Sequence, residues 1–327
     1  MNDLVKKGYL GNLDQLISAR RVTIAEGPAK GNDIIEVQTA GGLVLDVLPD
    51  TGLDLGQCSY KGVNMSWMSK NGYDSPAVIG HYESEFDNHF PGGLLYTCGL
   101  RNAGPQNRDG EEWQPTHGRY HSLAATQVST EVTDSFITIC GRIRETALFG
   151  HVLEVRRTIR IPVSGASIEI EDKITNLTPK DEAVLMIYHC NFGYPMLSEK
   201  AQLVFPEAHQ TLPRTDFAKT GLGRECVFDP PQDNEPERVF FHVLTKDYRV
   251  QLENPDLSVR MTMTWSGSTL PLLSEWRSMG SGDYVLGLEP CNTTLQGRAA
   301  EKANGTAKVL KAYETMTNKM KIEFANL

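Results

Sequence analysis

Two stretches of the sequence place titratable side chains where proton transfer could occur. The segment YVLGLEPCN (284–292) is typical of a short buried strand, and Glu289 stands where that strand leaves the core. A carboxylate there costs free energy unless it is paired, hydrogen-bonded or solvated. The segment LMIYHCNFGYP (185–195) places His189 within an apolar, aromatic strand. A lone histidine there is more often a hydrogen-bonded core residue, but together His189 and Glu289 could flank a small molecule as acid and base.

A second group of polar side chains lies in THGRYHS (116–122), where His117 and His121 are four residues apart. On a helix this spacing would put both imidazoles on one face, as in a zinc site. The following SLAATQVSTEV is typical of an entering strand, and on a strand His117, Arg119 and His121 would share one face. Such an array suits donation of hydrogen bonds to hydroxyl or carboxylate oxygens. A solvated basic edge explains the same residues equally well.

Glycines and polar side chains also occur together in HFPGGLLYTCGLRNAGP (89–105). The glycines permit tight turns and close approach of the backbone, and Arg101 and Asn102 offer hydrogen-bond donors beside them. The same residues would also suit a strand and a tight turn with ordinary surface polar groups.

The elements that must position these residues are short strands separated by Gly, Pro or Ser-Gly. Alternating or β-branched segments recur at 34–49 (two strands around a Gly-Gly turn), 135–146, 151–162, 166–176, 181–192, 238–244, 248–255, 257–265, 284–290, 307–316 and 319–326. Four apolar residues, Leu10, Leu13, Leu16 and Ile17, predict one short N-terminal helix with Asn12 as its cap. Because strands do not alternate with helices, the pattern predicts an all-β fold, a large antiparallel sandwich or barrel.

Two longer segments interrupt the succession of strands. Residues 64–93 carry several aromatic side chains among polar residues and glycines, and residues 206–237 are rich in Pro, Asp and Glu. Loops of this length are often functional or mobile. No repeat or linker divides the chain, so we expect one domain over 1–327, with 1–40 as helix and lead-in strands.

Composition excludes several classes of function. The chain of 327 residues has a net charge of −9, with 40% hydrophobic residues and 22% charged ones. A protein with no basic stripe and this charge is expected to bind neither nucleic acid nor acidic membranes. The N-terminus has no apolar signal-type core, and no apolar run is long enough to span a bilayer. The six dispersed cysteines favour free thiols and a cytoplasmic location.

Taken together, the motifs resemble the aldose 1-epimerase (galactose mutarotase-like) superfamily, in a less characterised branch. The matching segments occur in the expected order between about residues 40 and 325: GLDLGQCSYKG, GGLLYTCGLRNAGP, HGRYHS, YHCNFGYP, LGLEPCN and QGRA. The resemblance implies a β-supersandwich, with a sugar site on a concave face of a sheet.

The resemblance also implies roles for individual residues. Glu289 would be the general base and His189 the general acid, and His117 would hold sugar oxygens. Further substrate contacts are implied for Arg119, Asn102, Asp54, Trp276, Arg298 and His89. No metal or other cofactor is implied, the partner is a small-molecule sugar, and a homo-oligomer is compatible with the sequence. Characterised mutarotases carry an arginine pattern where this chain reads CGLRNAGP, so the identity of the sugar stays open.

The implied reaction is the interconversion of α and β anomers by ring opening and closure. Two alternatives are left open by the sequence. One is a metal-dependent, cupin-like sugar isomerase that would use His117, His121, His189 and a carboxylate as ligands. The other is a non-catalytic carbohydrate-binding protein on the same fold, since a fold does not fix a function.

Overall fold

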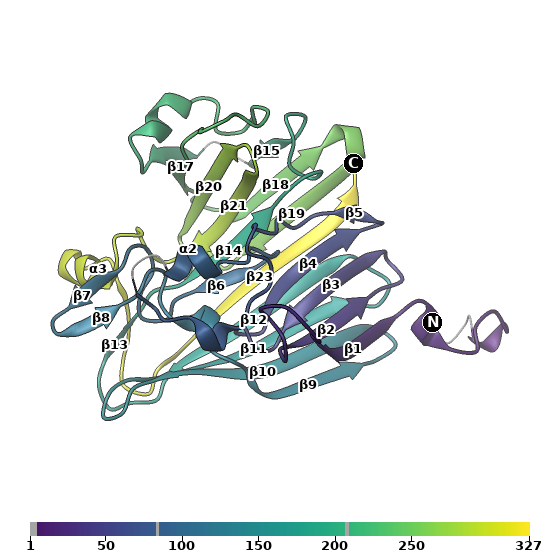
Figure 1. The fold of residues 1–327 in the computed structure, drawn as a ribbon, viewed down its shortest axis with the longest axis horizontal. Coiled ribbons are helices and arrows are strands. Elements are labelled where there is room, and N and C mark those ends of the chain that lie inside the picture. The colour runs from purple at the N-terminus through teal and green to yellow at the C-terminus, as the bar shows by residue number, and fades with distance from the viewer. Residues whose placement is uncertain (1–4, 83–84, 207–208) are drawn as a thin grey trace.

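The computed structural model describes residues 5–82, 85–206 and 209–327, and its regular structure consists mainly of antiparallel strands (Figure 1). The first sheet is a meander of five strands in chain order, each paired with the next. Its strands are β1 (Ser18–Thr23), β2 (Asp33–Gln38), β3 (Leu43–Leu48), β4 (Asp54–Tyr60) and β5 (Val63–Asn64). The turn between β2 and β3 contains Gly41 and Gly42, as the sequence predicts.

The largest sheet has eight strands in the order β15-β18-β19-β23-β12-β11-β10-β9. Its strands are β9 (Thr126–Val132), β10 (Phe136–Thr146), β11 (Val152–Pro162), β12 (Ser167–Asn176), β15 (Gln202–Val204), β18 (Arg249–Asn254), β19 (Val259–Trp265) and β23 (Thr315–Asn326). Along β10 and β19, buried and partly exposed residues alternate. One face of this sheet therefore packs on the core and the other faces solvent.

The third sheet has six strands in the order β16-β17-β20-β21-β14-β6. Its strands are β6 (Tyr96–Cys98), β14 (Ile187–Phe192), β16 (Gln210–Pro213), β17 (Arg238–Val243), β20 (Leu272–Gly280) and β21 (Asp283–Cys291). Every residue of β14 is buried, and so are the last seven of β21. The centre of this sheet is therefore covered on both faces.

The two smaller sheets pack against the eight-stranded sheet and form a sandwich. Isolated bridges join the five-stranded sheet to the segments around the six-stranded one, at Leu55–Leu95 and Ser66–Phe192. One hydrophobic cluster takes side chains from all three sheets, among them Val37, Ile139 and Tyr188. A second cluster covers the opposite face of the six-stranded sheet. The predicted all-β sandwich is thus confirmed.

Short elements complete the fold. They are η1 (Leu13–Gln15), η2 (Pro76–Val78), α2 (Glu85–His89), η3 (Tyr120–Ser122), η4 (Phe217–Gly221), η5 (Pro255–Leu257), α3 (Arg298–Asn304) and the strand pairs β7 (Asn107–Asp109) with β8 (Glu112–Gln114) and β13 (Glu182–Val184) with β22 (Lys308–Leu310). Among the described residues, no helix is long and apolar enough to cross a membrane. All six cysteines are free thiols, as expected.

Three sequence-based boundaries were wrong. The segment 181–192 is not one strand, because it divides into β13 and β14, which belong to different sheets. Conversely, β23 is one continuous strand over Thr315–Asn326, where the sequence predicts two separate strands at 307–316 and 319–326. The expected N-terminal helix is only the single turn η1, although Asn12 does cap it by accepting from the Asp14 N–H at 2.9 Å.

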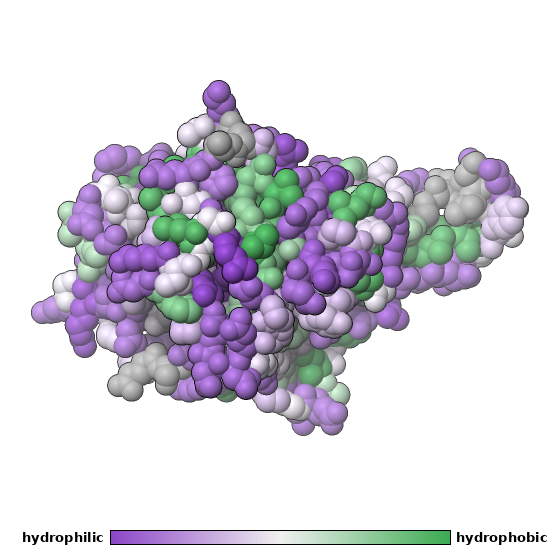
Figure 2. All heavy atoms as spheres, turned by 90° about the horizontal axis from the view of Figure 1, so that it is seen from above, coloured by the Kyte–Doolittle hydropathy of each residue, from purple (hydrophilic) through white to green (hydrophobic). Residues whose placement is uncertain are grey.

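The surface seen from above is mostly hydrophilic, with hydrophobic residues gathered near the middle of that face (Figure 2). The segment that precedes β1 projects from the body of the molecule in both views. Tyr9, in that segment, is 77% exposed.

Candidate active site

Glu289 and His189 meet on the six-stranded sheet because their strands are neighbours. Strand β14 pairs with β21 through Ile187–Cys291 and Cys190–Leu288, and this register puts His189 opposite Glu289. On the other side of β21, Ser274 pairs directly with Glu289. Cross-strand neighbours on one face lie close enough to interact. The sheet therefore builds a row of three polar side chains, although they come from distant parts of the chain.

The carboxylate and the imidazole lie in direct contact. Glu289 Oε1 is 3.0 Å from His189 Nε2, and the two residues are only 2% and 6% exposed. Gly287, two residues before the carboxylate, makes room for it, since a Cβ there would lie 2.7 Å from Glu289 Oε1. The glycine of the LGLEP motif is thus part of the site.

Asn191 fixes the orientation of the His189 ring. His189 Nδ1 lies 2.7 Å from Asn191 Oδ1, while the Asn191 amide donates to the carbonyl oxygens of Gly93 and His189, both at 3.0 Å. Because the amide nitrogen is occupied by two acceptors, the oxygen must face the ring. That oxygen can only accept, so Nδ1 carries a proton and Nε2 is the atom free to exchange one with Glu289 or a ligand.

Two buried oxygens in this row have hydrogen-bonding capacity that the protein leaves unused. Within the described part of the chain, neither Glu289 Oε1 nor Ser274 Oγ has a hydrogen bond of ordinary geometry, although Glu289 Oε1 lies 3.0 Å from His189 Nε2. Burial raises the pKa of Glu289, and the neighbouring His189 opposes that rise. Buried oxygens are normally hydrogen-bonded. These two are placed to bind a polar ligand.

A pocket of about 320 Å³ opens over the row. It is lined by Phe86, Asp87, Phe90, Gly104, Pro105, Thr116, His117, His189, Arg214, Glu237, Val239, Ser274, Trp276, Glu289 and Leu295. The centres of the Trp276 and His189 rings lie 5.3 Å apart, and Trp276 Nε1 donates to Glu237 Oε2 at 2.7 Å. The pocket thus offers aromatic faces and charged oxygens side by side.

His117 enters the pocket from a loop, and its neighbour Gly118 explains how. A Cβ at Gly118 would lie 2.3 Å from the Gly99 carbonyl oxygen, so only glycine permits this packing. His117 itself adopts a left-handed conformation with φ 56°. Burial, together with the nearby His189 and Arg214, lowers the pKa of His117 to about 3. His117 therefore offers a neutral imidazole near neutral pH.

The strand expected for 117–121 is absent from the described structure, because Tyr120–Ser122 forms the turn η3 instead. Arg119 is consequently separated from the two histidines, whose rings both contact Phe86, at centroid distances of 4.9 Å for His117 and 5.7 Å for His121. Arg119 is exposed and does not line the pocket. His121 is buried, with its ring stacked on Tyr96 at a centroid distance of 4.9 Å.

Asp54 lies in the core and not in the pocket. It is fully buried, and its Oδ1 is 2.6 Å from Arg157 Nη1, while Asp172 Oδ2 is 2.7 Å from Arg157 Nη2. The Thr97 N–H also donates to Asp54 at 2.6 Å. The structure thus places Asp54 in a buried ion triad between the sheets, which does not fit the expected substrate contact.

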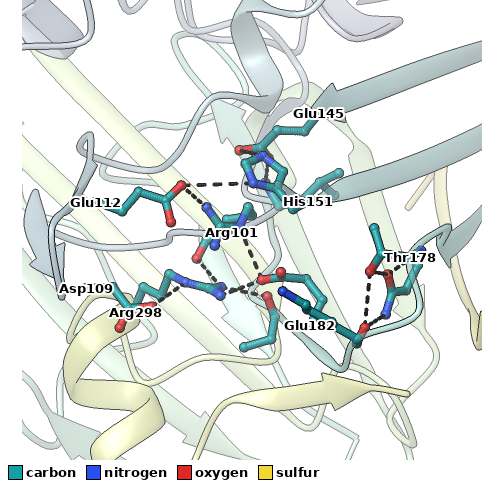
Figure 3. A network of polar contacts seen from close by, with 12 residues as sticks. Arg101, Asp109, Glu112, Glu145, His151, Thr178, Glu182 and Arg298 are labelled. Atoms are coloured by element: carbon teal, nitrogen blue, oxygen red, sulfur yellow. Dashed lines mark hydrogen bonds and ion pairs between the residues drawn. The ribbon is translucent and has the colours of Figure 1, made fainter. Parts of the chain in front are cut away.

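Arg298 belongs to a polar network that also contains Asp109 and Glu182 (Figure 3), and Asn102 contacts the backbone of Arg298. Arg298 forms ion pairs with Asp109, at 2.9 Å, and with Glu182. Asn102 Oδ1 accepts the Arg298 N–H at 2.7 Å, and its amide donates to Pro115 O at 2.6 Å. The polar groups of both side chains are paired within the protein, and neither side chain lines the pocket. They support the loops behind it, contrary to the expected sugar contacts.

His89 also lies outside the pocket lining. Its Nδ1 contacts Asp74 Oδ2, and its Nε2 is 3.3 Å from Glu85 Oε2. These contacts anchor α2, whose Phe86 does face the pocket. Of the nine residues expected at the site, the structure therefore brings four together: Glu289, His189, His117 and Trp276.

Sequence reasoning missed several lining residues, although part of the signal was present. Arg214 and Glu237 come from the long acidic segment 206–237, and Phe86 and Phe90 from the aromatic segment 64–93. The length of both segments is the one signal in the sequence that indicates a function for them. Ser274 was not foreseen, because the segment that forms β20 was not predicted as a strand from the sequence.

Among the described residues, no group of three or more His, Cys, Asp or Glu side chains is arranged to hold a metal ion. His117 and His189 have ring centres 6.2 Å apart, but His121 is packed against Tyr96. The ligand set of the cupin-like alternative is therefore not assembled.

Comparison with known protein sequences gives one matching family. A family model described as a domain of unknown function (DUF4432) matches residues 29–324. No curated protein sequence matches the chain significantly.

Several solved structures share the fold. A candidate aldose 1-epimerase from Klebsiella pneumoniae subsp. pneumoniae MGH 78578 has a TM-score of 0.87 at 21% identity, covering 98% of this chain and 90% of that one. A galactose mutarotase-like protein from Clostridium acetobutylicum has a TM-score of 0.66 at 15% identity, covering 96% of this chain and 100% of that one. The galactose 1-epimerase of Lactobacillus acidophilus NCFM has a TM-score of 0.65 at 14% identity, covering 95% of this chain and 99% of that one. The chain thus has the galactose mutarotase-like fold.

Proposed function

The chain belongs to the DUF4432 family, and we propose that it is an aldose 1-epimerase-like enzyme that interconverts the α and β anomers of a sugar. One observation carries the proposal: a buried carboxylate and a buried imidazole lie 3.0 Å apart in a pocket, and the carboxylate oxygen has no hydrogen bond of ordinary geometry among the described residues. Proteins of this fold that are named as galactose 1-epimerases or mutarotase-like proteins support the same reaction class.

The reaction needs one base and one acid close together, because the two oxygens that exchange protons are attached to the same carbon. Glu289 removes the proton from the anomeric hydroxyl, and His189 Nε2 donates a proton to the ring oxygen. The C1–O5 bond breaks, and O1 becomes the oxygen of the free aldehyde. After rotation about C1–C2, the ring closes on the other face of the carbonyl. Both proton transfers then run in reverse and restore Glu289 and His189.

The surroundings of the pair suit these roles. Burial raises the pKa of Glu289 and so makes it a stronger base than an exposed carboxylate. The hydrogen bond to Asn191 leaves Nε2 of His189 as the exchanging atom. Neutral His117 can donate to, or accept from, a sugar hydroxyl, and Trp276 offers an apolar face to the ring.

The charges of the lining favour a neutral sugar over an anionic one. Asp87, Glu237 and Glu289 face the pocket together with one arginine, Arg214, which is exposed and donates to Leu295 O at 2.8 Å. A carboxylate or phosphate on the sugar would have to approach three carboxylates. Like charges disfavour such binding.

The proposal is tested with two-dimensional exchange NMR on neutral aldoses, deoxy sugars and uronates. Exchange cross-peaks between α and β anomers should grow faster with enzyme than with buffer for at least one neutral sugar, and less so for its uronate. Calorimetric titration of the same sugars distinguishes an enzyme from the remaining alternative, a protein that binds sugars without catalysis. Binding without faster exchange would identify a non-catalytic carbohydrate-binding protein and overturn the proposal.

A further inference from the structure

An apolar groove continues from the candidate active site along the six-stranded sheet, and the proposed reaction makes no use of it. The groove has a volume of about 600 Å³. Its apolar lining comes mainly from β16, β17 and β20 and consists of Leu212, Pro213, Phe241, Val243 and Leu272. Thr294, Gln296 and Arg214 supply the polar lining. An apolar surface bordered by hydrogen-bonding groups is typical of a ligand site.

The groove and the pocket over Glu289 are neighbouring compartments. Arg214 lines both hollows and reaches Leu295 O with its Nη2 at 2.8 Å. Leu295 lines the pocket, while the residues on either side of it, Thr294 and Gln296, line the groove. One side chain and one loop therefore form the boundary between the two, so a ligand could extend across it.

The register of the sheet gives the direction and the scale of this extension. Leu212 pairs with Phe241, Phe241 with Ser274, and Ser274 with Glu289. Strands are spaced about 4.8 Å apart, so Phe241 lies about 10 Å from Glu289 along this row. A sugar whose anomeric carbon is at Glu289 would cover Ser274 with its own ring. A second ring linked to it would lie over Phe241.

We propose that this groove is a subsite for a second sugar ring, so that the preferred substrate is a reducing disaccharide or a longer oligosaccharide; the inference rests on the proposed function. The ring of Phe241 and the side chain of Leu272 contact the C–H face of the second ring. Thr294, Gln296 and Arg214 each make one side-chain hydrogen bond within the protein, and their remaining donors and acceptors hydrogen-bond the hydroxyls of the second ring. An alkyl chain would displace water from these remaining groups without pairing them, which costs binding free energy. The mixed lining therefore favours a sugar over a lipid tail.

The test compares kcat/KM for anomer exchange of disaccharides with that of the monosaccharide at their reducing end. Maltose, cellobiose and lactose are compared with glucose, and galactobiose with galactose. We expect at least one disaccharide to exceed its monosaccharide by 10-fold or more. Phe241→Ala should lower that disaccharide-to-monosaccharide ratio at least 10-fold, and Gln296→Ala, at an exposed residue that carries little risk to folding, should lower it several-fold.

Phe149→Ala is the matched control, because Phe149 is 99% exposed in the turn between β10 and β11, far along the chain from the groove residues. It should leave the ratio unchanged. Equal kcat/KM for every disaccharide and its monosaccharide would overturn the subsite and leave the proposed function intact. If no sugar shows faster exchange, calorimetry still tests the subsite. A disaccharide that binds more tightly than its monosaccharide, and loses this advantage in Phe241→Ala, would support the subsite. Equal binding of the two sugars would overturn the subsite.

Discussion

At the level of single residues, the site is a pair that neither strand could reveal alone. Glu289 and His189 are one hundred residues apart in the sequence, and their proposed pairing came from family resemblance and not from composition or periodicity. The structure supplies the physical link, because the register of β14 with β21 sets them opposite each other. Asn191 was not foreseen, since its function depends on which atom of His189 it meets.

Asn191 is expected to be a positioning residue. Asn191→Leu removes the oxygen that accepts from His189 Nδ1 and so cannot hold the ring, and it should lower kcat about 10- to 100-fold. Asn191→Asp keeps an accepting oxygen at the same place and should retain clearly more of kcat than Asn191→Leu. Asn234→Leu, at an exposed turn, is the matched control and should leave kcat unchanged. Equal kcat in Asn191→Leu and the unmutated protein would contradict the assignment.

The fall of kcat/KM at acidic pH is expected to follow the protonation of Glu289 and not that of His117. The base must be deprotonated, so kcat/KM should fall as pH falls through the pKa of Glu289, which burial raises above its ordinary 4.5. His117 has a pKa of about 3 and stays neutral throughout this window. His117→Gln should therefore lower the plateau of kcat/KM without moving the limb. A shift of the limb in that variant would show that His117 is the titrating group.

At the level of elements, the sequence pattern located the strands with one polar face and also the buried strand β21, but it missed a break inside another buried segment. β10, β11 and β12 lie close to the expected segments because their exposed positions alternate with buried ones. In 181–192 the apolar run is continuous, and such a run carries no signal for the break between β13 and β14. Family resemblance supplied four of the pocket residues, whereas Arg214 and Glu237 depend on how a long loop returns to the sheet.

Strand β21 makes a specific prediction through Gly287. An alanine there would bring its Cβ within 2.7 Å of Glu289 Oε1 and displace the carboxylate from His189. Gly287→Ala should lower kcat at least 10-fold, while far-UV circular dichroism stays native. Gly280→Ala is the matched control, because its Cβ would meet no atom closer than 3.3 Å. Equal activity of the two variants would show that the position of the carboxylate does not matter.

At the level of the whole molecule, the layers are held together by a hydrophobic core with an ion triad inside it. Arg157, Asp54 and Asp172 are all fully buried between the sheets. The sequence offered Asp54 as a site residue because it stands in a family-like motif, and only the packing of β4 on β11 and β12 shows its actual partners. Breaking such a group leaves unpaired buried charge.

Replacing Arg157 should therefore reduce stability much more than replacing its neighbour. Arg157→Met would strand two buried carboxylates and should lower the free energy of unfolding by about 3–5 kcal/mol. Arg156→Met removes a side chain that is 66% exposed and should change it by less than about 0.5 kcal/mol. Urea denaturation followed by tryptophan fluorescence measures both. Similar losses in the two variants would contradict a structural role for the triad.

The central claim is that Glu289 and His189 move protons on a sugar. The most direct measurement is the α–β exchange rate of the best neutral sugar, by exchange NMR, with Glu289→Gln, His189→Asn and the exposed control Glu131→Gln. We predict that both site variants, folded by circular dichroism, lose the catalysed exchange and that Glu131→Gln retains it. Full exchange activity in folded Glu289→Gln would contradict the account.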